Sequence, residues 1–110
     1  MSRPRKCRVI QCKPDATYFK PRGIPLVDLD EISISIDELE SIRLADFEGL
    51  YHEDAALKMK ISRQTFGRIL NEARRKVAEC LLKSKALKIE LPKKEELYES
   101  MFSGSRSQRN

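Results

Sequence analysis

Residues 60–76, KISRQTFGRILNEARRK, bring forked donors, amides and cations together in one short stretch. An arginine guanidinium can donate two parallel hydrogen bonds, and a glutamine or asparagine amide can donate one and accept one. These patterns match guanine and adenine edges in the major groove of DNA, and a threonine methyl can contact a thymine methyl. The side chains of these types are Arg63, Gln64, Thr65, Arg68 and Asn71. We expect them to read bases from the exposed face of one helix.

The apolar residues around this set predict the helix that would carry it. Ser62 suits an N-cap, because its hydroxyl can accept a hydrogen bond from a backbone N–H of the first turn. Apolar residues then recur along one side of a helix over about 62–82. They are Phe66, Ile69, Leu70, Ala73, Val77, Cys80 and Leu81. The polar set falls on the opposite side of the N-terminal half, the part that would enter a groove.

A second group of side chains suits phosphate oxygens, not base edges. Two of the residues in this group lie at the start of the helix or just before it, and three follow the last base-reading candidate, Asn71. Cations and hydroxyls in such places hold a protein on the duplex without reading its sequence. The phosphate-binding candidates are Lys60, Ser62, Arg74, Arg75 and Lys76.

The preceding residues predict a shorter helix and a tight turn. Glu53 and Asp54 suit the first turn of a helix over about 52–59, where carboxylates face the positive end of the helix dipole. Ala56 is small enough to let two helices approach closely. The side chains expected between the helices are Met59, Ile61, Phe66 and Ile69. Two helices joined by a turn of about three residues, the second one basic and amphipathic, are typical of a helix-turn-helix.

Lys60 departs from that pattern. The corresponding turn residue is usually glycine, because the backbone there adopts a positive φ. A lysine in this conformation costs about 1 kcal/mol. Tyr51 also departs from it, because a residue with a Ser-like side chain is expected to cap the shorter helix.

A strand and an acidic helix are predicted upstream. Alternating Ile and Ser over 32–36 indicate a strand, for which segments 8–12 and 86–91 are alternative partners. The acidic helix should cover 37–48, with Leu39, Ile42 and Ala45 on one face. Its expected capping box pairs Asp37 with Glu40, and Gly49 is the expected stop. The acids of this helix are most simply solvated, although they could also neutralise the basic N-terminus or dock on RNA polymerase.

Composition bounds the partners and the class of protein. The 110 residues are 40% apolar and carry a net charge of +5, which indicates one small domain with an acidic partner such as nucleic acid. Charge is segregated: residues 1–25 carry seven Lys or Arg and one Asp, and residues 26–50 carry one Arg and eight acids. No apolar run is long enough for a membrane span, and no signal-peptide pattern follows the start. We expect a cytoplasmic protein.

The first basic block contains a candidate DNA arm. Arg3, Arg5, Lys6 and Arg8 surround a proline and a cysteine in RPRKCR. Such a segment is either a free tail or an arm that reaches into the minor groove, as homeodomain arms do.

The cysteines and the single histidine offer only weak chemistry. Cys7 and Cys12 are spaced C-x4-C, wider than the usual zinc knuckle, and a tetrahedral site would need Cys80, His52 or a second subunit. Cys80 continues the apolar stripe and is expected to be a buried hydrophobe. We expect no metal and no cofactor. An enzyme is not expected either, because the chain has no glycine-rich phosphate loop and no nucleophile with a nearby base.

Several longer segments together resemble a known family. They are RPRKCR, TYFKPRGIPL, DELESIRLADFEGL and SRQTFGRILNEARRKVAECL. In this combination the chain, over roughly 3–91, is similar to an uncharacterised prokaryotic family of predicted DNA-binding proteins. The helix-turn-helix of that family is similar to region four of bacterial sigma factors. The resemblance implies DNA binding and a regulatory role.

We therefore expect a mainly α-helical protein, with a trihelical helix-turn-helix core and a small accessory sheet built from the N-terminal, 32–36 and 86–91 segments. The predicted division is an arm and extended loop over 1–31, the DNA-binding domain over 32–91, and a short helix with a polar tail over 92–110. The expected function is sequence-specific binding of double-stranded DNA by a homodimer that regulates transcription. The alternatives are a cysteine-based metal or redox sensor and an adaptor that docks on RNA polymerase through helix 37–48.

Overall fold

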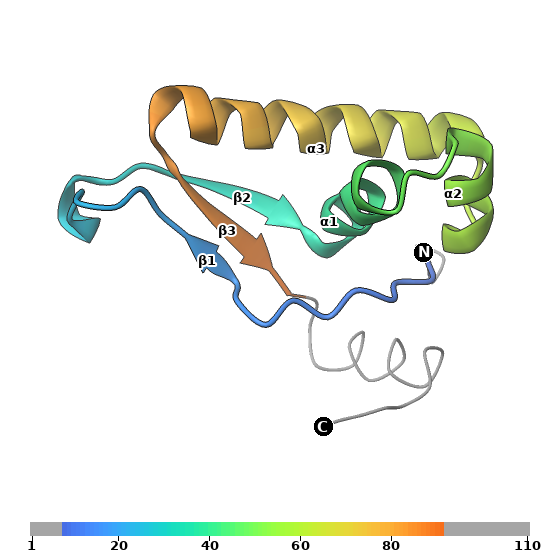
Figure 1. Cartoon of the computed structure of the whole chain (residues 1–110), viewed down its shortest axis with the longest axis horizontal. Helices are drawn as coiled ribbons and strands as arrows, with labels where there is room; N and C mark the ends of the chain where they lie inside the picture. The colour runs from blue at the N-terminus through green and yellow to red at the C-terminus, as the bar shows by residue number, and fades with distance from the viewer. Residues whose placement is uncertain (1–7, 92–110) are drawn as a thin grey trace, which may run out of the picture.

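Three helices and a three-stranded sheet form the fold in the computed structural model, which describes residues 8–91 (Figure 1). In chain order they are β1 (Tyr18–Phe19), β2 (Glu31–Ser35), α1 (Ile36–Ile42), α2 (His52–Met59), α3 (Arg63–Lys83) and β3 (Ala86–Glu90). A 3-10 turn at Leu26–Asp28 precedes β2, and α1 continues as a π-helical turn over Arg43–Phe47. The expectation of a mainly helical small domain with an accessory sheet is confirmed. The short helix expected within 92–110 lies outside the described residues.

The sheet is held together by its last strand. Its order is β1-β3-β2, with β3 antiparallel to β1 and parallel to β2. Ile34 lies opposite Ile89 in this ladder, and both are buried. Of the two partners considered for the 32–36 strand, the 86–91 segment is therefore correct. Segment 8–12 is not a strand.

The capping box of α1 was predicted two residues too late. Ser35 is the N-cap, and its hydroxyl accepts a hydrogen bond from the Glu38 N–H at 3.1 Å. The Glu38 carboxylate in turn accepts from the Ser35 N–H at 2.9 Å. Because the chain passes directly from β2 into the helix, the last extended residue supplies the cap. This leaves Asp37 and Glu40 available for contacts with other parts of the chain.

Gly49 ends the first helical segment, as expected. Its φ is +78°, a conformation that glycine adopts without steric cost. The Leu50 N–H then donates to the Leu44 carbonyl at 3.0 Å and closes the turn. Helix α2 begins directly afterwards. Its N-cap residue Tyr51 makes no side-chain capping hydrogen bond, consistent with the missing Ser-like residue.

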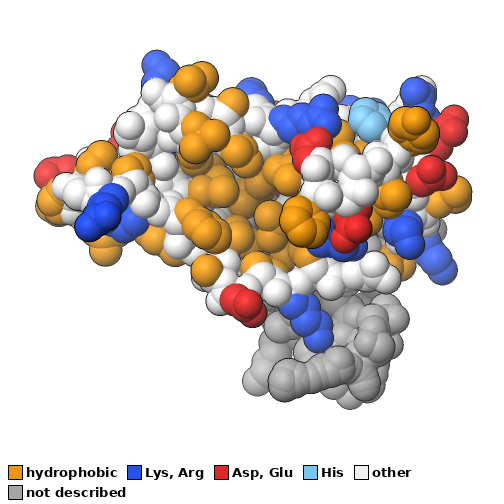
Figure 2. Space-filling model, in the orientation of Figure 1, with side chains coloured by type: hydrophobic (Ala, Val, Ile, Leu, Met, Phe, Trp, Pro, Cys, Tyr) orange, Lys and Arg blue, Asp and Glu red, His pale blue; other side chains and the backbone are white. Residues whose placement is uncertain are grey.

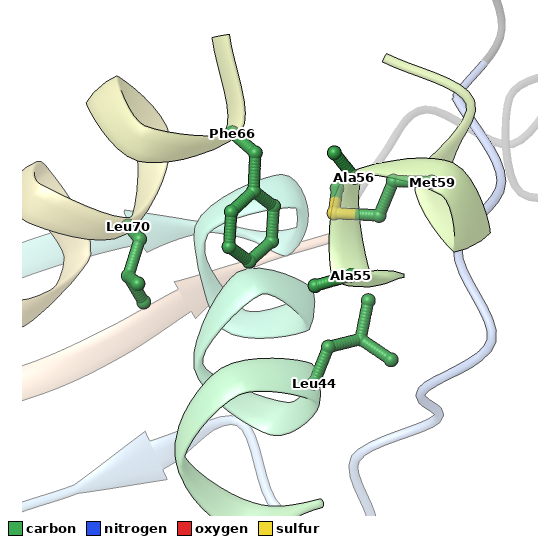
Figure 3. Packing of buried hydrophobic residues seen from close by; sticks show 6 residues of the cluster. All are labelled: Leu44, Ala55, Ala56, Met59, Phe66 and Leu70. Atoms are coloured by element: carbon green, nitrogen blue, oxygen red, sulfur yellow. The ribbon is translucent and has the colours of Figure 1, made fainter. Parts of the chain in front are cut away.

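A compact apolar cluster fixes α2 against α3 (Figure 3). Its fully or nearly fully buried members are Leu44, Ala55, Ala56, Met59, Phe66 and Leu70. Ala56 is 3% exposed, in agreement with the prediction of close helix approach at this position. Ile61 packs against the cluster. Ile69 is only partly buried and does not belong to it, so this part of the predicted core was wrong.

The C-terminal half of α3 packs on the sheet. Ala73 is buried with Ile34 and Ile89, and Val77 packs against them. Leu81 was predicted to continue this stripe but is 78% exposed. Cys80 and Leu81 are neighbours and point about 100° apart on a helix, so only Cys80 faces inward. Figure 2 shows apolar side chains gathered over the face between α3 and the sheet.

Candidate nucleic-acid interface

The N-terminus of α3 is fixed by Ser62. The Ser62 hydroxyl accepts a hydrogen bond from the Thr65 N–H at 3.0 Å and donates one to Thr65 Oγ1 at 2.9 Å. The N-cap prediction is therefore confirmed. Both hydroxyls are already engaged with each other, so Ser62 and Thr65 have less freedom for an external partner than a freely rotating side chain.

Three of the predicted reading residues form one outward stripe. Gln64, Arg68 and Asn71 are exposed and follow at spacings of four and three, which places them above one another on α3. Phe66, Leu70 and Ala73 are buried on the other side. Arg63 is also exposed at the start of the helix, whereas Thr65 is only partly exposed. The first turns of α3 thus present a polar face with forked donors and amides.

Lys60 adopts the left-handed conformation that the turn demands. Its φ is +59° and its ψ is +46°. The Ile61 N–H donates to the Ala56 carbonyl at 3.1 Å and closes α2. The strain expected from the sequence is therefore present in the fold, and an exposed cation lies two residues before the N-cap of α3.

Replacing Lys60 with glycine should stabilise the protein. Glycine removes the clash between Cβ and the backbone, so we expect the free energy of unfolding to rise by about 1 kcal/mol. Urea denaturation followed by circular dichroism measures it. Lys58→Gly is the matched control: it lies within α2, where glycine should lower stability by about 0.5–1 kcal/mol. If both variants changed the free energy of unfolding by the same amount and in the same direction, Lys60 would not be strained.

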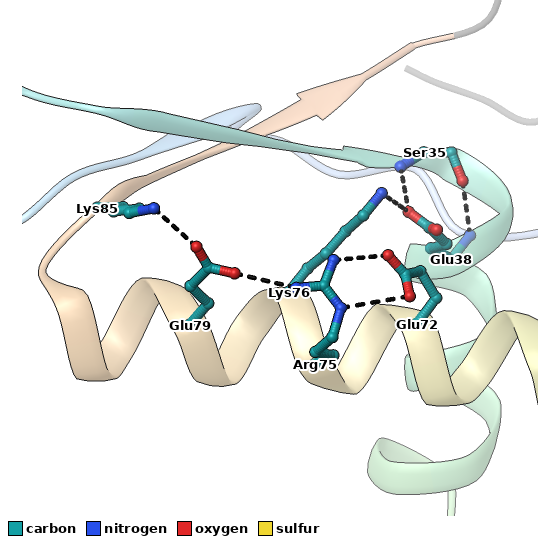
Figure 4. A network of polar contacts seen from close by, with 7 residues as sticks. All are labelled: Ser35, Glu38, Glu72, Arg75, Lys76, Glu79 and Lys85. Carbon is teal, nitrogen blue, oxygen red and sulfur yellow. Dashed lines mark hydrogen bonds and ion pairs between the residues drawn. The ribbon is translucent and has the colours of Figure 1, made fainter.

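The cations farther along α3 are paired with acids of the same chain (Figure 4). Arg75 contacts Glu72 at 2.7 Å and Glu79 at 3.0 Å, and Lys76 contacts Glu38 of α1 at 2.9 Å. Arg74, not drawn in that view, contacts Asp46 at 2.7 Å. Three of the five phosphate-binding candidates therefore already have acidic partners.

The cations at and just before the start of α3 have no such acidic partners among the described residues. Among residues 8–91, no ion-pair partner is found for Lys60, Arg63 or Arg68. Within this part of the chain, Lys60, Arg63 and Arg68 thus place three cations without an ion-pair partner at the α2–α3 turn and in the first turns of α3.

The ion pairs lower the pKa of the acids involved. Hydrogen bonds from Arg74 hold the pKa of the Asp46 carboxyl below its ordinary value of 3.8. Hydrogen bonds from Arg75 act in the same way on Glu72, and those from Lys85 on Glu79. Such groups favour folding above the pKa of the unfolded chain, and their contribution is lost as the pH falls through the lower folded value.

We therefore expect the protein to lose stability as the pH falls, and we expect protonation of Asp46 to account for part of this loss. The melting temperature of the Asp46→Asn variant should lie below that of the wild type at pH 7. The difference should shrink once the pH falls below about 4, as the wild-type carboxyl becomes protonated. Thermal melts of both proteins between pH 7 and pH 3 measure it. A difference that is unchanged over this range would contradict the pairing.

Two residues were missed as candidates at the sequence level. Gly67 lies inside α3, and a Cβ atom built there would meet, within 4 Å, no atom beyond its two chain neighbours and the adjacent backbone of its own helix. The fold itself therefore does not require glycine at this position. Glu40 was predicted to belong to a capping box, but its carboxylate is 1% exposed and bonds to the N-terminal segment and Arg43. The view of helix 37–48 as a solvated acidic face is wrong for this residue.

The cysteines are poorly placed for redox chemistry. Burial, followed by the nearby Glu40 carboxylate, raises the pKa of the Cys12 thiol to about 12, so the reactive thiolate is scarce at neutral pH. Cys80 is buried as predicted, and its pKa is also raised by burial. Cys7 lies outside the described part of the chain. Within 8–91, no group of three His, Cys, Asp or Glu residues is arranged to hold a metal ion.

Comparison with other proteins places the chain in a family. A model for the family described as Protein of unknown function DUF134 matches residues 1–95. The chain belongs to this family. The DUF134 match covers the N-terminal segment, all three helices and the sheet. No solved structure matches the chain.

The relatives carry the family name UPF0251. The UPF0251 protein of Thermoanaerobacter pseudethanolicus is 51% identical over 90 residues, which cover 82% of this chain and 76% of the relative. That of Prosthecochloris aestuarii is 51% identical over 88 residues, which cover 80% of this chain but 57% of the relative. That of Chlorobaculum tepidum is 52% identical and is covered to 58% of its length. Some DUF134 proteins thus extend well beyond the matched region.

In the described part of the present chain, no helix is long and apolar enough to cross a membrane.

Proposed function

We propose that the protein binds double-stranded DNA sequence-specifically and regulates transcription. Helices α2 and α3 act as a helix-turn-helix, and the N-terminal half of α3 enters the major groove. The observation that carries this proposal is the exposed stripe of Gln64, Arg68 and Asn71, with Arg63 beside it. Forked donors and amides on one helix face match the hydrogen-bonding edges of guanine and adenine.

The distribution of free and paired cations supports docking by the first turns of α3. The helix is 21 residues long, about 31 Å, so only part of it fits within a groove. Arg63 and Arg68, for which no ion-pair partner is found among the described residues, lie in its first turns, Lys83 lies at its far end, and Lys60 lies at the preceding turn. In our proposal Lys60 contacts a phosphate there, where a strained lysine replaces the expected glycine.

Gly67 is a further supporting observation. Glycine inside a helix costs roughly 0.5–1 kcal/mol relative to alanine, and no neighbouring atom in the fold excludes a side chain here. Gly67 precedes Asn71 by one turn and follows Arg63 by one turn. A duplex that approaches the backbone of α3 closely at this point would account for the glycine.

Arg74 is proposed to exchange partners on binding. Its bond to Asp46 joins two side chains that are 49% and 41% exposed, and such pairs contribute little to stability. A phosphate can therefore compete for the guanidinium. Arg75 and Lys76 would require the same exchange, from Glu72, Glu79 and Glu38.

Removing the acid that pairs with Arg74 should tighten DNA binding. We expect the Asp46→Asn variant to gain several-fold in affinity at low salt, and its salt slope to steepen by about one counterion. Asp28→Asn is the matched control, because it removes the same charge from the 3-10 turn, which lies at the opposite end of the molecule from the start of α3 (Figure 1). Fluorescence anisotropy at several salt concentrations measures both slopes. Equal gains in affinity in the two variants would indicate that the change in net charge, and not the release of Arg74, causes the tighter binding.

The function is tested by selecting bound fragments from a random duplex pool with purified, metal-free protein. We expect a recurring sequence to be enriched, with affinity that falls steeply as salt rises. We also propose that the protein binds as a homodimer, so the enriched fragments should contain two related half-sites about 34 Å apart. Absence of binding to any duplex at low salt would refute the proposal.

An adaptor that docks on RNA polymerase through helix 37–48 has less support. Every acid of this helix is already bonded inside the chain. The pairs are Asp37–Arg8, Glu38–Lys76, Glu40–Arg43, Asp46–Arg74 and Glu48–Arg43. These acids offer a cationic partner less charge than the sequence alone suggests.

A further inference from the structure

The two edges of the sheet differ in their protection against pairing with another strand. Within residues 8–91, the sheet order β1-β3-β2 leaves one side of β1 and one side of β2 unpaired. β1 has only two residues, and Lys20 and Pro21 follow it directly. Short length, lysine and proline are usual means by which an edge strand avoids further pairing. β2 has five residues, contains neither lysine nor proline, and carries no charge from Ile32 to Ser35, so it is the edge open to a partner.

The backbone of β2 presents free hydrogen-bonding groups at two exposed residues. The Ala86 N–H of β3 donates to the Asp30 carbonyl at 2.8 Å. Alternate residues of a strand direct their N–H and C=O groups to the same neighbour, so the two isoleucines of β2 also face β3. Glu31 and Ser33 therefore direct theirs away from the sheet, and both residues are exposed. Together they offer a partner strand two donors and two acceptors.

Helix α3 lies where a second copy would add another helix at packing distance. Ile34 of β2 and Ile89 of β3 lie opposite each other and are buried with Ala73 of α3, so the helix covers the junction of the two strands. A two-fold axis at the free edge of β2 places the next α3 two strand spacings away, or about 10 Å. Packed helices lie about 8–10 Å apart. A sheet continued across two copies would therefore carry two helices in contact.

The flank of α3 that runs along β2 carries alternating charges (Figure 4). Lys76 contacts Glu38 at 2.9 Å near the end of β2, and Glu79 contacts Lys85, just before β3, at 2.7 Å. Glu72, Lys76 and Glu79 follow one another on this flank at spacings of four and three. Two such flanks in antiparallel orientation bring Lys76 beside the partner's Glu79, and Glu79 beside the partner's Lys76. The flank is therefore complementary to its own copy, as a two-fold interface requires.

We propose that a second copy of the chain pairs with the free edge of β2, antiparallel and about a two-fold axis, so that two three-stranded sheets form one sheet of six strands. Glu31 faces the partner's Ser33, Ser33 faces the partner's Glu31, and the two Ile32 side chains meet at the axis. The Ser35 N–H is already bonded to Glu38, so this register uses the free groups most completely. The contact rests on the homodimer of the proposed function, but it forms without DNA.

The pairing presents both reading faces on one side of the dimer. The exposed stripe that contains Arg68 points away from the side of α3 that packs on the sheet. Val77 packs against the same cluster as Leu87, which is paired with Ile32, so the axis lies near Val77 along the helix. Arg68 precedes Val77 by nine residues, or about 13 Å. With about 10 Å between the helices, the two Arg68 positions lie about 30 Å apart, close to the roughly 34 Å between half-sites.

Every group in this contact belongs to residues 8–91. Of the predicted DNA arm, only Arg8 lies in that range, and it is paired with Asp37 of α1. Arg3, Arg5 and Lys6 lie outside the described part of the chain. The experiments below therefore change only described residues.

The variant Ser33→Pro tests the contact. Because the Ser33 N–H faces the free edge, proline removes a donor from the dimer but no bond from the β2–β3 ladder. Sedimentation velocity without DNA, over a wide range of concentrations, should show the wild type passing from monomer to dimer. The variant should dimerise about tenfold more weakly or less, because each dimer loses two hydrogen bonds. Ser33→Ala is the matched control: it loses the side-chain bond to Glu90 but keeps the N–H, so it should dimerise like the wild type.

Amide hydrogen exchange tests the same contact in the wild type and does not depend on how well a variant folds. Exchange at the Glu31 and Ser33 N–H groups should slow several-fold as the protein passes from monomer to dimer. The N–H of Lys20, which follows the other edge of the sheet, should exchange at the same rate in both states. Exchange at Ser33 that is already slow in the monomer would overturn the inference, because another segment of the same chain would then cover the edge.

The remaining outcomes separate this contact from DNA binding. A dimer that Ser33→Pro leaves intact, in a variant whose circular dichroism is native, would overturn the inference. A wild type that stays monomeric at every concentration would overturn it as well, even if the protein reads DNA through Arg68. A wild type that dimerises through this edge but binds no duplex would support the contact and refute the proposed function.

Discussion

Replacing Arg68 with alanine is expected to reduce affinity for the selected DNA site by about 5- to 150-fold. A bidentate contact between arginine and a base contributes roughly 1–3 kcal/mol of discrimination. Arg68 lies at the centre of the exposed stripe, one turn from both Gln64 and Asn71. Binding to unrelated duplex should change far less, because phosphate contacts supply most of it. Anisotropy titrations with selected and scrambled duplexes measure the two affinities.

Lys83→Ala is the matched control for Arg68→Ala. Lys83 is exposed at the last position of the same helix, so the variant loses one charge without altering the proposed reading face. We expect it to retain its preference for the selected site. A similar loss of preference in both variants, or none in either, would refute base reading by the stripe.

Replacing Gly67 with alanine is expected to have opposite effects on stability and binding. The added methyl has open space in the free protein, and alanine favours helix, so the free energy of unfolding should rise by roughly 0.5–1 kcal/mol. In the complex the same methyl would meet the duplex. Overpacking of a close contact costs about 1–3 kcal/mol, which corresponds to a 5- to 150-fold loss of affinity. Urea denaturation and anisotropy titration on one protein sample measure the two effects.

The outward residue Ala78 supplies the reverse control. Ala78→Gly should destabilise the same helix by about 1 kcal/mol without affecting affinity, because it is exposed two turns beyond Asn71. A Gly67→Ala variant that is both more stable and fully active in binding would show that the duplex does not approach α3 at this residue.

Local patterns were sufficient to predict the helices that carry the candidate site. The bounds of α2, the Ser62 cap, the positive φ of Gly49 and the strained turn at Lys60 all depend on residues within a few positions of one another. Periodicity also placed Phe66, Leu70 and Ala73 on the buried side of α3. Such features follow from propensity and helix geometry, which are local properties of the chain.

What sequence reasoning missed depends on contacts between distant segments. Glu40 fits a capping box by spacing, and only the fold shows that its oxygens bind Gln11 and Cys12, 29 and 28 positions away. The pairing of Arg74 with Asp46, 28 positions apart, is equally absent from any local pattern. The sequence therefore could not show that Arg74, Arg75 and Lys76 already have acidic partners, whereas no ion-pair partner is found among the described residues for Lys60, Arg63 and Arg68.

The parallel pairing of β2 with β3 also constrains the order in which the chain can fold. Ser33 and Glu90 bond across this ladder although they are 57 positions apart, and all three helices lie between the two strands. Loop closure over such a distance carries an entropic cost that is reduced once the intervening helices are formed and packed. During synthesis the sheet must wait until β3 has left the ribosome, so we expect the helical unit to assemble first and the sheet to complete the fold.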